Sequence, residues 1–199
     1  MYDLPTSITI EDKQYPIRKD GDYRMVLDCF SALQDVELPE KERVITSLSI
    51  FYDSVLFSDS LYNVFEIFDT EEKLDLAVKG MFNFFNCNKQ NVGNKTPYKL
   101  LDWEDDEQMI VSAVNKVANT EIRAVPYMHW FTFMGYYSAV GKSVLSTVVE
   151  IRGKIKRGKK LEKHEQEFRR ENPHYFVWNS STIEDKEAEN YVNEIWNSQ

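Results

Sequence analysis

The chain has 199 residues, of which 42% are hydrophobic and 29% charged, so its composition is that of a globular protein and not of a disordered one. Its net charge of -9 at pH 7 opposes binding to nucleic acid or to anionic membranes, except where one face is locally basic. The sequence holds no run of about 18 apolar residues, which excludes a membrane-spanning helix, and its two cysteines lack the spacing of a metal or redox site.

Residues 7–17 alternate between apolar and polar side chains, which predicts a small β-hairpin with its turn at Asp12-Lys13. From Asp20 to Phe85 the apolar residues recur at helical spacing, in segments joined by short connections. Asp69 and Glu72 have the spacing of a helix capping box. We therefore expect a mainly α fold, a multi-helix globular bundle with a small N-terminal β-hairpin, in a single domain that spans residues 1–199.

Residues 86–97 contain Asn, Gly and Pro without periodicity, so we expect a loop there that can serve as a hinge. The next helix is expected to begin among five acidic residues, which could bind Mg²⁺ or could favour the positive end of the helix dipole. The second explanation is preferred, because no second acidic cluster with a suitable base is evident in the sequence. The five acidic residues are Asp102, Glu104, Asp105, Asp106 and Glu107.

The segment from Tyr127 to Tyr137 is apolar nearly all round, which predicts a buried central helix with Pro126 in its first turn. His129 lies within this segment and is expected to be a buried, hydrogen-bonded structural residue. Directly afterwards, apolar residues at helical spacing predict a second helix from Ser143 onward, with Ile151 on its buried stripe.

A basic run follows, and residues 150–170 hold nine Lys/Arg against four Glu. We expect residues 152–172 to form a basic, partly solvated helical extension that ends at Asn172-Pro173. Such a run can be a solvated helix face, a protein-binding face or a nucleic-acid patch; the last fits least, because groove-reading motifs and interleaved aromatic residues are absent. The candidate protein-binding residues are Arg152, Lys156, Arg157, Lys159 and Lys160.

After the basic run, residues 175–178 are apolar and are expected to dock on the core. Thr182 and Asp185 are expected to cap a last helix with one apolar face. No catalytic pattern emerges from the chain: Gly141-Lys142-Ser143 lacks the first glycine of a phosphate-binding loop, and His164 lacks the second histidine of a helical zinc site. We expect a protein that is not an enzyme and that uses no cofactor or metal.

The second half of the chain resembles a known family through an Asp-aromatic-acidic opening, a His-Trp-x-x-Phe helix and an Ile-Arg that closes the following helix. The family is the bacteriophage "gene product fifteen" family of long-tailed phages and prophages of Gram-positive bacteria. One departure from its pattern is the link at residues 120–125, where the family often has Gly and Asp. The motif residues, which we interpret as structural, are Asp102, Trp103, His129, Trp130, Phe133 and Ile151.

Members of that family lie among tail genes near the gene for the tape measure protein. The resemblance therefore implies a tail assembly chaperone in the host cytoplasm, which binds the tape measure protein and copies of itself. The alternative is a structural component of the virion, such as a minor tail or head–tail joining protein. Neither implied function involves nucleic acid or a membrane as partner.

Overall fold

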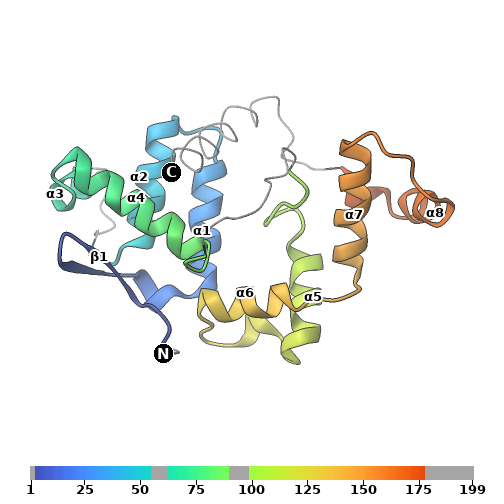
Figure 1. Ribbon diagram of the computed structural model, residues 1–199, viewed down its shortest axis with the longest axis horizontal. Helices are drawn as coiled ribbons and strands as arrows, with labels where there is room; N and C mark the ends of the chain where they lie inside the picture. The colour runs from blue at the N-terminus through green and yellow to red at the C-terminus, as the bar shows by residue number, and fades with distance from the viewer. Residues whose placement is uncertain (1–2, 55–61, 90–98, 178–199) are drawn as a thin grey trace. The chain divides into compact units, whose positions relative to one another are not determined.

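The computed structural model describes residues 3–54, 62–89 and 99–177, and within them it confirms a mainly α fold with one N-terminal β-hairpin (Figure 1). Three short 3-10 helices also occur, η1 at Arg18–Gly21, η2 at Ile122–Ala124 and η3 at Pro173–Phe176. The strands and α-helices are β1 Ser7–Ile10, β2 Lys13–Pro16, α1 Tyr23–Gln34, α2 Glu40–Phe51, α3 Tyr62–Ile67, α4 Glu71–Phe85, α5 Glu107–Ala118, α6 Trp130–Ser138, α7 Val144–Lys156 and α8 Lys163–Glu171.

The chain divides into two compact units. Unit 1 contains the described residues of Met1–Asn91 and Tyr127–Met134, and unit 2 those of Val92–Pro126 and Gly135–Thr182. The single domain expected from the sequence stays a prediction. Of the expected hinge loop at 86–97, residues 86–89 form a turn after α4, and the remainder lies outside the described residues.

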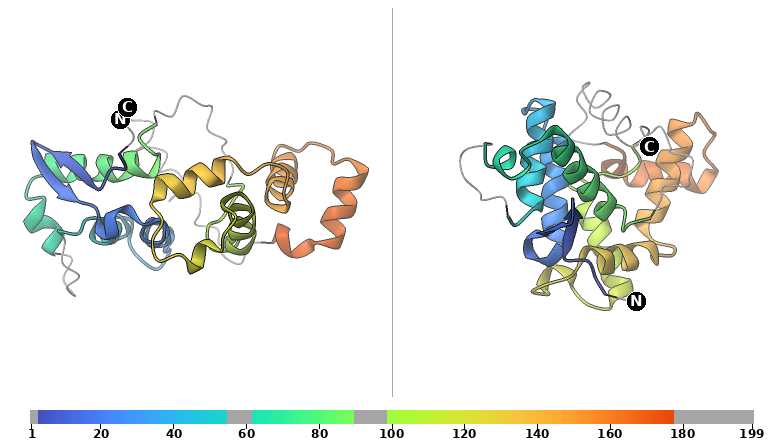
Figure 2. Two further views of the ribbon diagram at one scale, coloured as in Figure 1. Left: turned by 90° about the horizontal axis from the view of Figure 1, so that it is seen from below. Right: turned by 60° about the vertical axis from the view of Figure 1, so that its left-hand side comes forward.

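In unit 1, the hairpin pairs Ile8 with Tyr15 and Ile10 with Lys13. Its two-residue turn is Glu11-Asp12, and both residues have positive φ. Two-residue hairpin turns need this conformation because it matches the twist of the two strands. The turn predicted at Asp12-Lys13 is therefore wrong by one residue, because Lys13 already pairs across the ladder. Strand β1 lies beside α4, as both views in Figure 2 show.

The core of unit 1 is built from large aromatic rings on α2, α4 and the start of α6. Phe51 meets Phe84 edge to face at 5.4 Å, and the two neighbours of these rings, Tyr52 and Phe85, are also buried. The Tyr52 hydroxyl donates a hydrogen bond to the Ala77 carbonyl at 2.8 Å, so its polar end is satisfied inside the core. The N-cap of α4 is Thr70, one residue later than the cap expected at Asp69. The Thr70 side chain accepts the hydrogen bond from the Lys73 N–H.

The aromatic segment differs from the expectation in where its helix begins. Helix α6 starts at Trp130; Tyr127 is exposed, and Pro126 lies in the turn that precedes the helix. The predicted buried helix from Tyr127 to Tyr137 is therefore too long, because backbone pairing of Tyr23 with Met128 holds the first residues in an extended conformation.

In unit 2, Ser143 is the N-cap of α7, which fits the helix start expected there. The Ser143 and Ser146 side chains form a capping box. The basic extension expected at 152–172 is divided into the last turns of α7, a loop and α8. Helix α8 ends before Asn172-Pro173, as the sequence predicts. Of the apolar run expected to dock on the core, Tyr175 and Phe176 belong to η3, and Val177 after them is 68% exposed. Residue 178 and the last helix expected from Thr182 lie outside the described residues.

Candidate functional site

Asp102 organises the turn that leads into α5. Its Oδ1 accepts hydrogen bonds from the backbone N–H groups of Glu104 and Asp105, both at 2.8 Å, and its Oδ2 lies 2.9 Å from Lys99 Nζ. Burial opposes the ionised carboxylate, but the Lys99 ammonium and the two backbone donors outweigh it and lower the pKa of Asp102. Asp102 therefore caps two backbone N–H groups of the turn that leads into α5.

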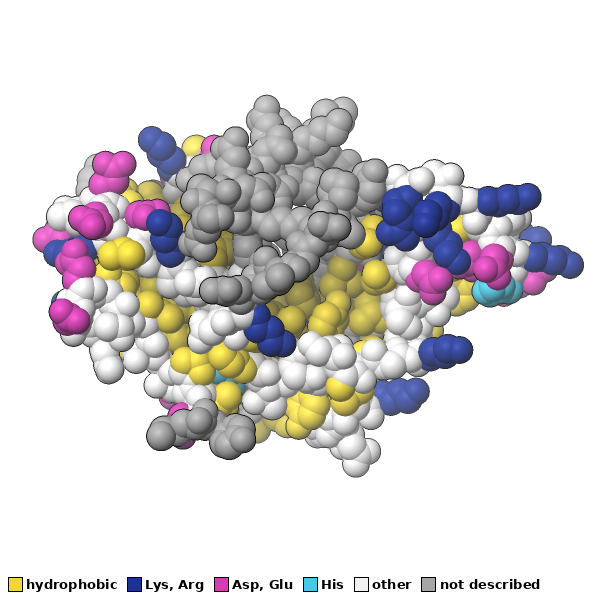
Figure 3. All heavy atoms as spheres, viewed as in Figure 1, with side chains coloured by type: hydrophobic (Ala, Val, Ile, Leu, Met, Phe, Trp, Pro, Cys, Tyr) yellow, Lys and Arg dark blue, Asp and Glu magenta, His cyan; other side chains and the backbone are white. Residues whose placement is uncertain are grey.

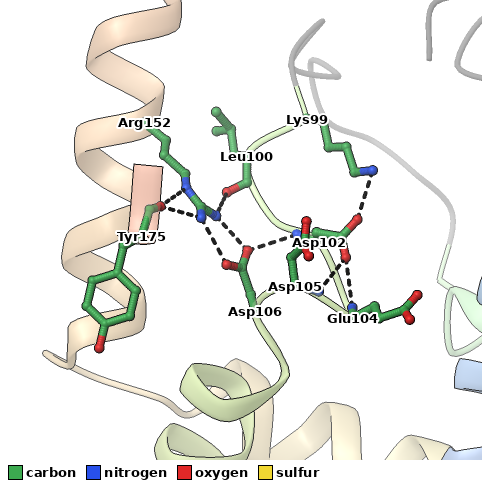
Figure 4. A network of polar contacts seen from close by, with 8 residues as sticks. All are labelled: Lys99, Leu100, Asp102, Glu104, Asp105, Asp106, Arg152 and Tyr175. Atoms are coloured by element: carbon green, nitrogen blue, oxygen red, sulfur yellow. Dashed lines mark hydrogen bonds and ion pairs between the residues drawn. The ribbon is translucent and has the colours of Figure 1, made fainter. Parts of the chain in front are cut away.

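Arg152 and Asp106 form a buried ion pair in unit 2 (Figure 4). Two guanidinium nitrogens of Arg152 donate to the two carboxylate oxygens of Asp106, at 2.5 and 2.9 Å. The same guanidinium donates to the carbonyls of Leu100 and Tyr175, and Asp106 also accepts from the Asp102 N–H. This network ties the turn before α5, helix α7 and η3 together.

Arg152 was expected on the protein-binding face, and that expectation is wrong. Its side chain is only 7% exposed, because α7 directs it toward Asp106 and away from the solvent. A charge this deep is stable only when it is paired and hydrogen-bonded, and Arg152 meets both conditions. Its role in the structure is to hold unit 2 together.

The other two motif residues of unit 2 are also packed against neighbours. Trp103 is half-buried and its ring lies 5.6 Å from that of Tyr137, while Ile151 is fully buried on α7. That these residues are structural stays a prediction; both side chains take part in the packing of unit 2.

In unit 1, His129 is 1% exposed and caps the N-terminus of α6 from the position just before the helix. Its Nδ1 accepts the Phe131 N–H at 3.0 Å, and its Nε2 lies 3.0 Å from the Pro5 carbonyl oxygen. A carbonyl can only accept, so Nε2 must carry the hydrogen and Nδ1 must be free of one. This pair of contacts fixes the neutral Nε2–H tautomer.

Burial lowers the pKa of His129, although the Pro5 carbonyl and the charges of Asp20 and Asp22 oppose that effect. At about pH 7.5 and above, the imidazole is essentially neutral in both the folded and the unfolded chain. As the pH falls, the unfolded chain takes up its proton first, so the free energy of unfolding decreases until the pH lies below the folded pKa.

We therefore expect the melting temperature to fall between about pH 7.5 and pH 5.5, with part of the fall due to His129. The variant His129→Asn keeps a side-chain acceptor for the cap but does not titrate. Its melting temperature, followed by circular dichroism, should depend less on pH over this range. Equal pH dependence in the two proteins would contradict the lowered pKa of His129 in the folded chain.

Trp130 and Phe133 anchor α6 in unit 1. Both are 1% exposed, and their rings stack with centroids 5.5 Å apart. Trp130 Nε1 donates to the Phe85 carbonyl at 2.9 Å, and Phe133 stacks on Tyr23 at 4.7 Å. These contacts explain why the motif needs large rings at both positions.

Seven of the exposed cations of unit 2 lie at the end of α7, in the loop that follows and on α8, where Figure 3 shows a group of Lys and Arg side chains. Helix α7 ends because Gly158 adopts a left-handed conformation, with φ of +64°, and Lys159 N–H turns back to the Lys154 carbonyl at 2.8 Å. We call this region the basic surface; it consists of the exposed residues Lys156, Arg157, Lys159, Lys160, Lys163, Arg169 and Arg170.

One ion pair fixes α8 to α7 beneath the basic surface. Glu165 is buried; it accepts from Lys154 Nζ at 2.5 Å and from the Glu162 N–H at 2.8 Å. The Lys154 ammonium, followed by the Glu162 N–H, lowers the pKa of Glu165. The ion pair of Lys154 with Glu165 therefore holds together α7 and α8, which carry most of the basic surface.

A family model described as "Bacteriophage Gp15 protein" matches residues 1–176. The chain belongs to the bacteriophage Gp15 protein family. The resemblance seen in the sequence is therefore confirmed, and membership of the Gp15 family indicates a phage structural or morphogenesis protein. Comparisons with curated proteins and with solved structures found no match.

Three residues that organise this Gp15-family chain have partners that the sequence did not reveal. Asp22 caps α1 and also accepts the Met128 N–H at 3.0 Å, while in unit 2 Asp106 pairs with Arg152 and Glu165 pairs with Lys154. The spacing of Glu162 and Glu165 resembles a capping box and was the one available signal. The partners of Asp22 and Asp106 lie far along the sequence, where local patterns carry no information about them.

Metal sites and membrane-spanning helices are both absent from the part of the Gp15-family chain that the structure describes. Among those residues, no group of three or more His, Cys, Asp or Glu side chains could hold a metal ion. The helices within the described ranges are too short or too polar for any of them to cross a membrane. The basic surface, with its seven exposed cations, is the charged feature of unit 2 that a partner could contact.

Proposed function

We propose that this Gp15-family chain is a tail assembly chaperone, which binds the tape measure protein in the host cytoplasm while the tail is built. The observation that carries the proposal is the basic surface: seven exposed cations on a chain whose net charge is -9. Because α7 and α8 are joined by the pair of Lys154 with Glu165, these cations are held on one scaffold and not on a free tail. Such a surface suits the acidic stripe of a helical partner.

Self-association is the second part of the proposal. Among the described residues of unit 1, 16 Asp/Glu outnumber nine Lys/Arg, whereas the exposed end of unit 2 is basic. Charges of opposite sign on different parts of one chain favour contact between copies, head to tail. The proposed role is one of binding, without catalysis, a cofactor, nucleic acid or a membrane.

The proposal predicts the effect of reversing four charges, with Lys156, Arg157, Lys159 and Lys160 all replaced by Glu. Co-expression with the wild-type chain should raise the soluble fraction of the tape measure protein, and the reversed variant should lose most of that effect. The four side chains are exposed, so each replacement should change the free energy of unfolding by no more than about 0.5 kcal/mol.

The matched control reverses four exposed lysines of unit 1, Lys13, Lys19, Lys41 and Lys89, which changes the net charge equally. This control should still solubilise the tape measure protein. If the two variants behave alike, net charge and not the basic surface is responsible. Absence of any effect from the wild-type chain would overturn the proposal.

Mass spectrometry of purified virions separates the chaperone from the alternative, a minor tail or head–tail joining protein. A chaperone leaves the particle, whereas a structural component stays at a fixed stoichiometry. DNA binding is the further control: we expect none at about 150 mM salt, where only strong phosphate contacts persist.

A further inference from the structure

Unit 2 has a hollow of about 340 Å³ between α5, the first turn of α7 and Tyr175. Its walls are mainly apolar, with Met109, Ala113, Val144 and Leu145 among them. The Val144 side chain is 46% exposed, although the neighbouring Leu145 is buried. Ligand pockets have volumes of about 300–1,000 Å³, so this hollow is large enough to receive a large apolar side chain.

Two unpaired cations stand beside the hollow. Lys116 lines it, and Lys142 immediately precedes the N-cap of α7. Both lysines are exposed, and neither has an ion-pair partner in the part of the chain that the structure describes. The carboxylates of Glu107 and Glu121, by contrast, are already paired with Arg123. The hollow therefore combines apolar walls with cations that can pair with the carboxylates of a partner.

Unit 1 presents the complementary feature on α3, where the Phe65 side chain is 45% exposed. Glu66 follows it in the same helix; it is exposed too, and within the described ranges it has no ion pair. Large aromatic side chains are enriched at protein interfaces. An exposed ring next to an unpaired carboxylate matches an apolar hollow next to unpaired lysines, both in shape and in sign of charge.

The other exposed apolar side chains of unit 1 match the hollow less well. The Tyr127 hydroxyl donates a hydrogen bond to the Asp20 carbonyl at 3.0 Å, so its polar end is already engaged within unit 1. Leu4 and Val36 also have acidic neighbours, but leucine and valine are under-represented among the residues that dominate binding. Phe65 is therefore the side chain of unit 1 that best fits the hollow.

We propose that the hollow of unit 2 receives Phe65 of a second copy of this chain, with Glu66 of that copy facing Lys116 and Lys142. The inference rests on the self-association in the proposed function and names the two surfaces that meet. Because these surfaces differ, the contact is heterologous. Each pair of copies keeps one free hollow and one free Phe65, so assembly continues beyond a dimer unless a ring closes.

Sedimentation velocity of the full chain at rising concentration tests the contact. We expect the wild type to form species larger than a dimer. Val144→Glu, which places a charge in the hollow, and Phe65→Glu, which removes the ring, should each weaken association at least about tenfold. Glutamate suits the first turn of α7, so that helix should persist. The matched control, Val36→Glu, adds the same charge at a valine that is 41% exposed and should associate like the wild type.

A mixture of the two variants in equal amounts is the sharper experiment. The Val144→Glu chain keeps its Phe65, and the Phe65→Glu chain keeps its hollow, so one intact contact can form between them. We expect a heterodimer that does not grow further, because the hollow and the ring left over are both altered. Phe65→Ala and Val144→Gln, which add no charge, replace these variants if circular dichroism shows that glutamate unfolds either chain.

The outcomes that overturn the inference are distinct from those that concern the chaperone function. Wild-type association in both hollow and ring variants would refute this contact but leave self-association through other charges in place. A mixture that stays monomeric would show that ring and hollow do not meet, and loss of association in Val36→Glu would trace the effect to added charge. A monomeric wild type would refute both the contact and self-association. Binding of the tape measure protein is measured separately, by the co-expression assay.

Discussion

Replacing Arg152 by Met is expected to reduce the free energy of unfolding by about 3–5 kcal/mol. Methionine keeps much of the apolar stem, so the change removes mainly the guanidinium. Asp106 would then be a buried carboxylate without its cation, and the carbonyls of Leu100 and Tyr175 would lose their donor. Chemical denaturation followed by circular dichroism measures the loss.

Two further variants separate the ion pair from general effects of substitution. Arg157→Met removes an exposed cation five residues later and should change the stability by no more than about 0.5 kcal/mol. Adding Asp106→Asn to Arg152→Met should restore part of the loss, because no unpaired charge is then left in the interior. A loss below about 1 kcal/mol for Arg152→Met alone would show that the pair is solvated.

Replacing Trp130 by Ala is expected to cost about 3–5 kcal/mol, through lost burial and the cavity that remains. The indole is fully packed in unit 1, between Phe133 and the ring of Phe30, which lies 5.9 Å away. Trp130→Phe keeps most of this area but leaves the Phe85 carbonyl without its donor, which should cost about 1 kcal/mol for the hydrogen bond.

Trp103→Ala is the matched control for Trp130, because Trp103 is only half-buried in unit 2. The same truncation should cost less there, since fewer neighbours lose contact. Equal losses at the two positions would contradict the packing described for α6. Denaturation of the two alanine variants also tests the single domain: one shared transition is expected, whereas separate transitions would mean that the units unfold independently.

The basic surface and Arg152 show that a run of cations in the sequence does not tell which of them are exposed. Lys156, Arg157, Lys159 and Lys160 are exposed, as a solvated run requires, but Arg152 lies in the same run and is buried. What separates them is the position of Arg152 on the inner face of α7, opposite Asp106. The apolar stripe of α7, which includes the buried Ile151, could have indicated that Arg152 lies close to the buried face. It could not have indicated that Asp106 is the partner of Arg152.

The motif around His129 shows a second limit. Hydrophobicity alone extends the helix back to Tyr127, since Tyr127 and Met128 are as apolar as the residues that follow. In the structure α6 begins only at Trp130, because Asp22 and Tyr23 hydrogen-bond the backbone of Met128. These two residues lie more than a hundred positions earlier in the chain. His129 can then turn its ring to cap the helix, a role that its neighbours in sequence do not reveal.

Taken by itself, the sequence determined the helical class, the hairpin, the Gp15 family and the run of cations, because these depend on spacing within one element or on a family pattern along the chain. Tertiary structure alone decided the place of Arg152, the tautomer of His129 and the pairing of Lys154 with Glu165. Each of these depends on groups distant in sequence that meet only after folding. The free energy of a buried charge or a capped helix end is set by those partners, which no local periodicity encodes.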